Sequence, residues 1–162
     1  MQTGVGEYIV GAYLKLIKEC SVVDYNVRAP GGGMKGLRGL DVVGLHFETK
    51  TAYLCEVTTH ITGLLYKNNQ TTVARIKQKH EFQIAYASQY LSDFPTRHYM
   101  YWSPVVPKGY ITENLGRISG LELIINEEYT RCIEELRKLA KKITCDVGNP
   151  FFRTLQILEH IR

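Results

Sequence analysis

Apolar residues recur every three or four positions in three segments of the chain, and this spacing predicts amphipathic helices. The segments cover residues 3–20, 70–91 and 129–143. In the longest of them, the predicted buried stripe consists of Val73, Ile76, His80, Ile84, Ala87 and Leu91. Asn149 followed by Pro150 predicts the start of a last helix, because Asn caps a helix and Pro suits its first position.

Shorter segments rich in β-branched and aromatic residues predict strands between these helices. The predicted strands cover residues 21–28, 38–47, 51–59, 97–102 and 121–126, and a short helix is expected at 112–119. The connection between the second and third strands is very short, so these two strands should pair as an antiparallel hairpin. The element order predicts one α/β domain over residues 1–162, with a mixed central sheet flanked by helices.

Composition excludes several classes of protein. Hydrophobic residues make up 44% of the chain and charged residues 22%, which is ordinary for a globular protein and excludes wholesale disorder. No apolar run approaches the roughly 20 residues that span a bilayer, and no basic segment marks a signal peptide, so we expect a cytoplasmic protein. Four cysteines lack the spacing of a zinc site and are expected to be small buried residues. The net charge of +4 is compatible with a polyanionic partner without requiring one.

Two acidic residues, Asp41 and Glu56, interrupt the otherwise apolar strands of the hairpin. Alternation of side chains along a strand puts Glu56 and Thr58 on one face. Reflection about a turn centred near Thr49 places Asp41 opposite residues 56–57. The two carboxylates are therefore expected to be neighbours, with about 5 Å between directly opposed Cβ atoms.

Burying two unpaired carboxylates side by side is costly, and a divalent cation removes the conflict. Carboxylate and carbonyl oxygens suit Mg²⁺ or Mn²⁺. The hairpin therefore predicts a metal site built on Asp41 and Glu56. The alternative is that one of the two carboxylates lies at the rim of the sheet and is solvated.

At this point the sequence resembles the PD-(D/E)xK nuclease superfamily, which includes restriction endonucleases and archaeal Holliday-junction resolvases. The resemblance covers residues 3–103 in the order helix, three strands, helix, strand. The matching residues are Gly6-Glu7, Leu40-Asp41 and Glu56-Val57-Thr58. The resemblance implies a restriction-endonuclease-like αβββαβ core, here followed by extra C-terminal helices.

The same resemblance implies an activity and roles for four residues. The activity is Mg²⁺-dependent hydrolysis of phosphodiester bonds by a DNA endonuclease, with DNA as the partner and no organic cofactor. Asp41, Glu56 and the carbonyl of Val57 would bind the metal, and Glu7 would support it directly or through water.

One position departs from the pattern of the family. Thr58 stands where the family usually has a lysine that orients the attacking water, and a threonine supplies no charge. The family sometimes relocates the basic group to the following helix. Lys77 is the predicted replacement because it borders the buried stripe of residues 70–91, whereas Lys79 is predicted to project to the opposite side. The alternatives are that Thr58 itself orients the water and that Lys77 is an ordinary solvated lysine.

Basic and polar residues near this site are candidates for contact with DNA. Arg28, Lys35 and Arg38 lie in or beside the glycine-rich segment 31–36, and phosphate contacts supply most of the non-specific affinity for DNA. Gln83, near the buried stripe of the long helix, is a further candidate contact. The alternative for the glycine-rich segment is a flexible connection.

Cutting both strands of a duplex requires two sites, and a homodimer supplies them symmetrically. The candidate interface is the last helix, through Phe151, Phe152, Leu155, Leu158 and Ile161. The alternative is that these residues pack onto the core of their own domain.

Two other functions stay open. One is a catalytically degenerate nuclease-fold protein that binds nucleic acid or a protein partner without cleavage. The other is an unrelated α/β interaction module whose Asp41 and Glu56 lie at the sheet rim.

Overall fold

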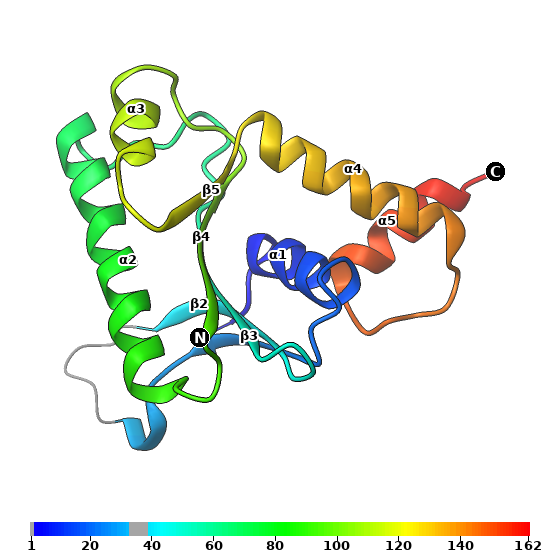
Figure 1. The fold of residues 1–162 in the computed structure, drawn as a ribbon. Helices are drawn as coiled ribbons and strands as arrows, with labels where there is room; N and C mark the ends of the chain where they lie inside the picture. Colours follow the sequence, from blue (N-terminus) through cyan, green and yellow to red (C-terminus); the bar gives the residue numbers. More distant parts are fainter. Residues whose placement is uncertain (1, 33–38) are drawn as a thin grey trace.

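Five strands form one sheet in the order β1-β2-β3-β4-β5. The structure is a computed structural model that describes residues 2–32 and 39–162 (Figure 1). The strands are β1 (Val22–Val27), β2 (Leu40–His46), β3 (Thr51–Val57), β4 (Thr96–Ser103) and β5 (Leu121–Ile125). The helices are α1 (Val5–Leu16), α2 (Asn69–Tyr90), α3 (Tyr110–Gly116), α4 (Glu127–Lys142) and α5 (Pro150–His160), with a 3₁₀ turn at Pro30–Gly32.

The sheet is mixed, as the sequence predicted. β1, β2 and β3 are antiparallel neighbours. After the crossover through α2, β4 pairs parallel to β3, and β5 pairs parallel to β4. The mixed pattern follows from the connections, because a short turn reverses the chain whereas a helical crossover preserves strand direction.

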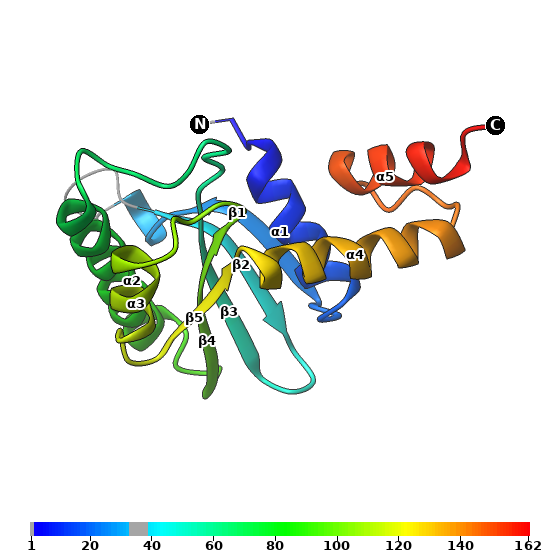
Figure 2. The ribbon, with the colours of Figure 1, turned by 90° about the horizontal axis from the view of Figure 1, so that it is seen from above.

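Helices cover both faces of the sheet. α2 and α3 lie on one face, whereas α1 and α4 lie on the other, with α5 packed against both of them (Figures 1 and 2). Among residues 2–32 and 39–162, no helix combines the length and the apolar character needed to span a bilayer.

The largest apolar core lies between the sheet and α1, α4 and α5, where Trp102 and Phe152 are fully buried. Two smaller clusters lie on the α2 side. One joins β2 and β3 to the C-terminal half of α2, and the other joins α2 to α3 around Tyr101. The prediction of buried cysteines is confirmed at three positions and wrong at Cys145, which is exposed.

The predicted helix at residues 70–91 is confirmed, and Asn68 caps it by accepting a hydrogen bond from the backbone N–H of Thr71. The predicted buried stripe is wrong in part, because Ile84 is 40% exposed whereas Gln83 is fully buried. Gln83 can be buried because its side-chain amide donates hydrogen bonds to two backbone carbonyls of the sheet. His80 is a hydrogen-bonded core residue, as expected, with its ring near the carbonyl of Ser119.

The last helix divides the residues of the predicted dimer interface into two groups. Phe152 and Leu155 are buried in the protein's own core, and Phe151 packs against it. For these three residues, packing within the domain is confirmed. Leu158 and Ile161 are instead exposed on the surface.

Candidate active site

Asp41 and Glu56 are neighbours on adjacent strands. The β2–β3 ladder runs from His46 opposite Thr51 to Val42 opposite Cys55, so the next step along it places Asp41 opposite Glu56. The backbone N–H of Val57 donates to Asp41 Oδ2 at 2.8 Å, which holds the carboxylate of Asp41 across the ladder.

Both carboxylates line a cavity of about 380 Å³ between the ends of these strands and α2. Arg28, Arg75 and Lys79 bring three cationic side chains to the same cavity, and Asn26, Gln78 and Phe82 contribute to its wall. The volume suits a nucleotide-sized ligand, since small-molecule sites typically measure about 300–1,000 Å³.

Glu56 is the buried acid of the pair, with 4% of its surface exposed. Burial raises the pKa of the Glu56 carboxyl to about 8, and the negative charge of Asp41 adds to the rise, whereas the Lys79 ammonium opposes it. Near neutral pH, a proton and Lys79 therefore compete to neutralise Glu56. A divalent cation would displace that proton.

Lys79 is the basic residue that α2 delivers to the carboxylates. Its Nζ lies 2.9 Å from Glu56 Oε2. Burial lowers the pKa of the Lys79 ammonium, but pairing with Glu56 more than offsets this effect, so the pKa of Lys79 is raised. Lys79 thus remains a cation beside the two acids.

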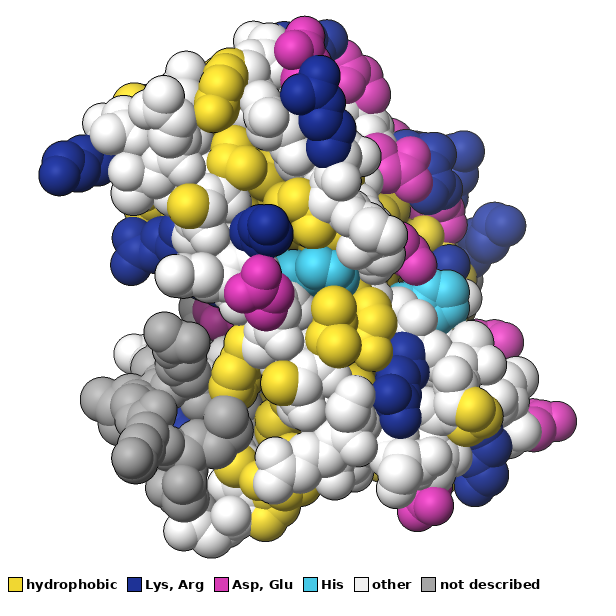
Figure 3. All heavy atoms as spheres, turned by 60° about the vertical axis from the view of Figure 1, so that its left-hand side comes forward, with side chains coloured by type: hydrophobic (Ala, Val, Ile, Leu, Met, Phe, Trp, Pro, Cys, Tyr) yellow, Lys and Arg dark blue, Asp and Glu magenta, His cyan; other side chains and the backbone are white. Residues whose placement is uncertain are grey.

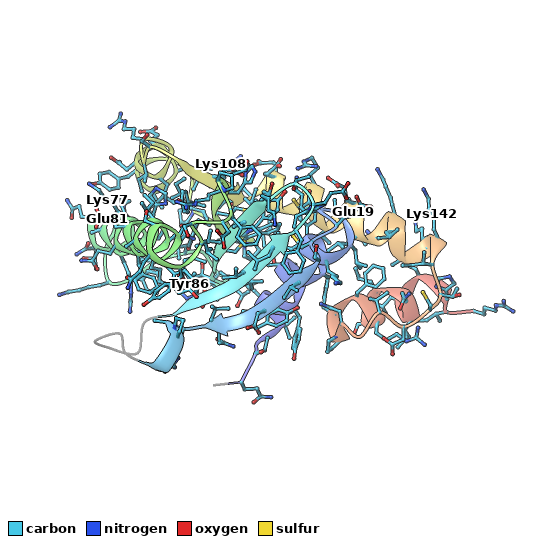
Figure 4. The ribbon with its side chains drawn as sticks, turned by 60° about the horizontal axis from the view of Figure 1, so that its bottom comes forward. Glu19, Lys77, Glu81, Tyr86, Lys108 and Lys142 are labelled. Atoms are coloured by element: carbon cyan, nitrogen blue, oxygen red, sulfur yellow. The ribbon has the colours of Figure 1, made fainter. Side chains whose placement is uncertain are left out.

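The prediction that Lys77 is the basic residue facing the site is wrong. Lys77 is exposed and lies with Glu81 on the side of α2 away from the sheet, whereas Tyr86 lies on the side facing it (Figure 4). The error follows from the error in the buried stripe. With Gln83 rather than Ile84 facing the sheet, the helix presents Lys79 to the carboxylates.

Thr58 does not replace the family's lysine in the geometry of the site. It is buried beyond the end of β3, and its Oγ1 lies 2.5 Å from the hydroxyl oxygen of Tyr101. Thr58 is not among the residues that line the cavity. Its hydroxyl already has a protein partner, so the predicted role in orienting water finds no support in this arrangement.

Glu7 is not brought into the cavity either. α1 packs on the opposite face of the sheet, so closely that a Cβ at Gly6 would lie 2.4 Å from Thr59 Cγ2 and 3.1 Å from Val57 Cγ1. Glu7 is in the first turn of α1, where its Oε2 turns back to within 2.6 Å of the position that a Cβ would take at Gly4. The unpaired N–H groups at a helix start favour this placement of a carboxylate.

The four predicted DNA contacts have different outcomes. Arg28 is exposed and lines the cavity. Gln83 is wrong as a contact, because it is fully buried and its Nε2 donates to the carbonyls of Leu54 and Met100 at 2.9 and 3.1 Å. Lys35 and Arg38 lie outside the described residues.

Two carboxylates and one backbone segment are available to a metal ion. In the described part of the chain, no group of three or more His, Cys, Asp or Glu side chains is placed to hold a metal. Asp41 and Glu56, with the carbonyl of Val57, form a set of oxygen ligands that fits Mg²⁺, which keeps several waters and uses one or two carboxylates. The adjacency of two acids, one of them deeply buried, is the observation that favours a cation here.

The sequence interpretation missed a second stripe on α2. Arg75, Gln78, Lys79 and Phe82 all line the cavity, at the spacing i, i+3, i+4 and i+7 of one helix face. That spacing is visible in the sequence as a polar stripe beside the buried one. A cluster of positive charge does not mark the site on the surface either. Lys and Arg side chains on this side of the molecule are interspersed with Asp and Glu (Figure 3).

No protein-family model matches the chain, and neither does a curated protein or a solved structure. Two adjacent carboxylates suit a metal ion, and three cationic side chains suit an anionic ligand bound to that ion. Phosphate esters are the common ligands of this kind.

Proposed function

We propose that this protein is a metal-dependent nuclease that hydrolyses phosphodiester bonds in DNA. The observation that carries the proposal is the opposition of Asp41 and Glu56 in a cavity where Lys79 pairs with Glu56. The order of elements from α1 to β4, with three antiparallel strands and a parallel fourth, is the one that the resemblance to PD-(D/E)xK nucleases implies. This order supports a restriction-endonuclease-like assignment.

Asp41, Glu56 and the carbonyl of Val57 would hold Mg²⁺ or Mn²⁺. A metal ion bound there lowers the pKa of a coordinated water and offsets charge on the scissile phosphate. The protein's own contribution is to hold Asp41 by the N–H of Val57 and to keep Glu56 buried at the wall of the cavity. Ionisation of Glu56 is favoured by Lys79, which opposes the effect of burial.

Lys79 takes the role that a strand lysine has in most of the family. It reaches the carboxylates from α2, one of the relocations that the resemblance allows. In the metal-bound protein, the Lys79 ammonium would orient the attacking water or stabilise charge on the phosphate. Lys77, exposed on the far side of the same helix, provides a matched control.

A cleavage screen tests the proposal. Duplex, single-stranded and branched DNA are incubated with Mg²⁺ or Mn²⁺, and the same substrates are incubated with EDTA. We expect cleavage that depends on the metal, is lost in Asp41→Asn and is retained in Lys77→Ala. Absence of cleavage from every substrate with either metal would overturn the proposal.

One observation favours a second candidate, a nuclease-fold protein that binds without cutting. The Lys79 ammonium already pairs with Glu56 without any metal, so the buried acid is partly satisfied by the protein alone. Thermal unfolding with and without Mn²⁺ separates the two candidates. A metal-binding site gives stabilisation that Asp41→Asn removes, whereas a degenerate site gives none.

A further inference from the structure

Arg75 is a cationic residue of the cavity that does not pair with either of its two carboxylates. It lies one helical turn before Lys79 on α2 and lines the same cavity. In the described part of the chain, no carboxylate forms an ion pair with Arg75, whereas the charge of Lys79 is already engaged by Glu56. The charge of Arg75 is therefore free for a ligand.

An aromatic ring lies under the exposed guanidinium of Arg75. Arg75 Cζ lies 4.5 Å from the centroid of the Tyr66 ring. A guanidinium stacked on an aromatic face keeps its in-plane N–H donors free, so it can still bind a phosphate with two hydrogen bonds.

Tyr66 is itself held in place from several sides. Its backbone N–H donates to Thr72 Oγ1 at 2.8 Å, and its carbonyl accepts from the N–H of Asn68 at 2.6 Å. The imidazole of His60 packs against its ring, with 5.2 Å between the ring centroids. An arginine on a supported ring loses less conformational freedom on binding a ligand than an arginine free in solvent.

We propose that Arg75 binds a backbone phosphate of the DNA next to the phosphate that is cut, and that Tyr66 positions its guanidinium for that contact. The proposal rests on the proposed nuclease function and adds the residue that sets the register of the strand in the cavity. One helical turn, about 5.4 Å, separates Arg75 from the Lys79 position. Arg75 therefore contacts a neighbouring phosphate rather than the one at the carboxylates.

A contact of this kind acts on binding more than on chemistry. Arg75→Ala should raise KM roughly tenfold to a hundredfold and leave kcat within about threefold, since a charge-assisted contact is lost equally from bound substrate and transition state. It should also lower the slope of log affinity against log salt by about one. Lys77→Ala, on the opposite side of the helix, should change neither quantity.

Variants of Tyr66 separate a positioning role from a merely structural one. Tyr66→Phe keeps the ring under Arg75 and should retain most of the affinity. Tyr66→Leu removes the ring and should lose several-fold in KM with little change in kcat. Arg75→Lys keeps the charge but not the planar pair of donors, so it should recover only part of the loss.

The decisive experiment replaces single phosphates of a short DNA oligonucleotide by neutral methylphosphonates and measures binding by fluorescence anisotropy without divalent metal. Wild-type protein should lose affinity at one position beside the cut site, and Arg75→Ala should show no further loss at that same position. Equal losses in both proteins at every position, or wild-type affinity in Arg75→Ala, would overturn the inference while leaving the nuclease proposal intact. A wild-type protein that neither binds nor cuts DNA would instead overturn the proposed function itself.

Discussion

The two faces of the sheet serve different purposes, although the same strands supply both. On the side of α1, α4 and α5, the sheet is covered by the largest apolar core of the protein. On the side of α2, two smaller apolar clusters flank a polar cavity, and buried polar groups such as Glu56, His80 and Gln83 are concentrated there.

Alternation along one strand produces this division. Cys55 and Val57 of β3 point into the large core, whereas Leu54 and Glu56 point towards α2. A substitution on the core side of β3 should therefore change mainly the free energy of unfolding. A substitution of its neighbour on the α2 side should change mainly the proposed activity.

If Glu56 holds the proposed metal ion, Glu56→Gln should reduce cleavage by at least about 10³-fold, because it removes a ligand and the several kcal/mol of charge stabilisation that a bound ion supplies. Its free energy of unfolding without metal should equal or exceed that of the wild-type protein, since the variant has no buried carboxyl beside Asp41. Turnover assays and urea unfolding measure the two quantities. Wild-type turnover in Glu56→Gln would contradict the assignment.

Phe152→Ala should give the opposite result. Phe152 is fully buried on the α5 side, so removing its ring should cost about 3–5 kcal/mol of unfolding free energy. Turnover per folded molecule should stay close to that of the wild-type protein, because the cavity lies on the other face of the sheet. Phe151→Ala, at the half-buried neighbouring position, is the control and should cost clearly less.

Lys79→Ala should lower turnover by about 10²–10³-fold, the usual effect of removing a group that stabilises charge in a transition state. Lys77→Ala should cleave normally, because its side chain lies on the other side of α2. The two variants have the same change of charge and the same helix, so only their position differs. Equal activity in both would show that the basic group lies elsewhere.

The fold was predictable from the sequence because each element carries its own local signal. The hairpin register shows this best: reflection about a short turn predicted the opposition of Asp41 and residues 56–57, and the ladder places Asp41 opposite Glu56. Strand alternation is strict, so one correct turn fixes the partners of every residue along the pair.

The helical part of the site was less predictable, for a physical reason. The rotation of α2 was inferred from its apolar residues, but the helix is anchored partly by Gln83, whose amide bonds two strand carbonyls. A buried glutamine looks like a surface residue in a sequence. The resulting error in the rotation of α2 led to the prediction of Lys77 in place of Lys79. The role of Glu7 was inferred from the resemblance alone, without considering that the N–H groups at the start of α1 favour a carboxylate there.

Stability of the metal-free protein should fall as the pH rises from about 5 to 8. The pKa of Glu56 is raised to about 8 in the folded protein by burial, so between its unfolded and folded pKa values the folded state binds the extra proton. The stabilisation is present at low pH and is lost as the pH passes through 8, by on the order of 1 kcal/mol per pH unit at most. Thermal unfolding in EDTA measures this slope, and Glu56→Gln should flatten it; an equal slope in both proteins would assign it to other groups.

The smallest effect on stability is expected at the outer surface of α5, where apolar side chains are exposed to solvent. Ile157, Leu158 and Ile161 are 57%, 60% and 66% exposed, and such a group of apolar side chains favours association. If a C2 dimer forms there, Leu158→Glu should shift the protein to monomer in light scattering at micromolar concentration. Its unfolding free energy, extrapolated to low concentration, should change by no more than about 0.5 kcal/mol, because an exposed side chain leaves the core untouched.

Ser88→Glu, on the exposed surface of α2, adds the same charge far from α5 and should leave the mass unchanged. A wild-type protein that is already monomeric at that concentration would contradict the dimer.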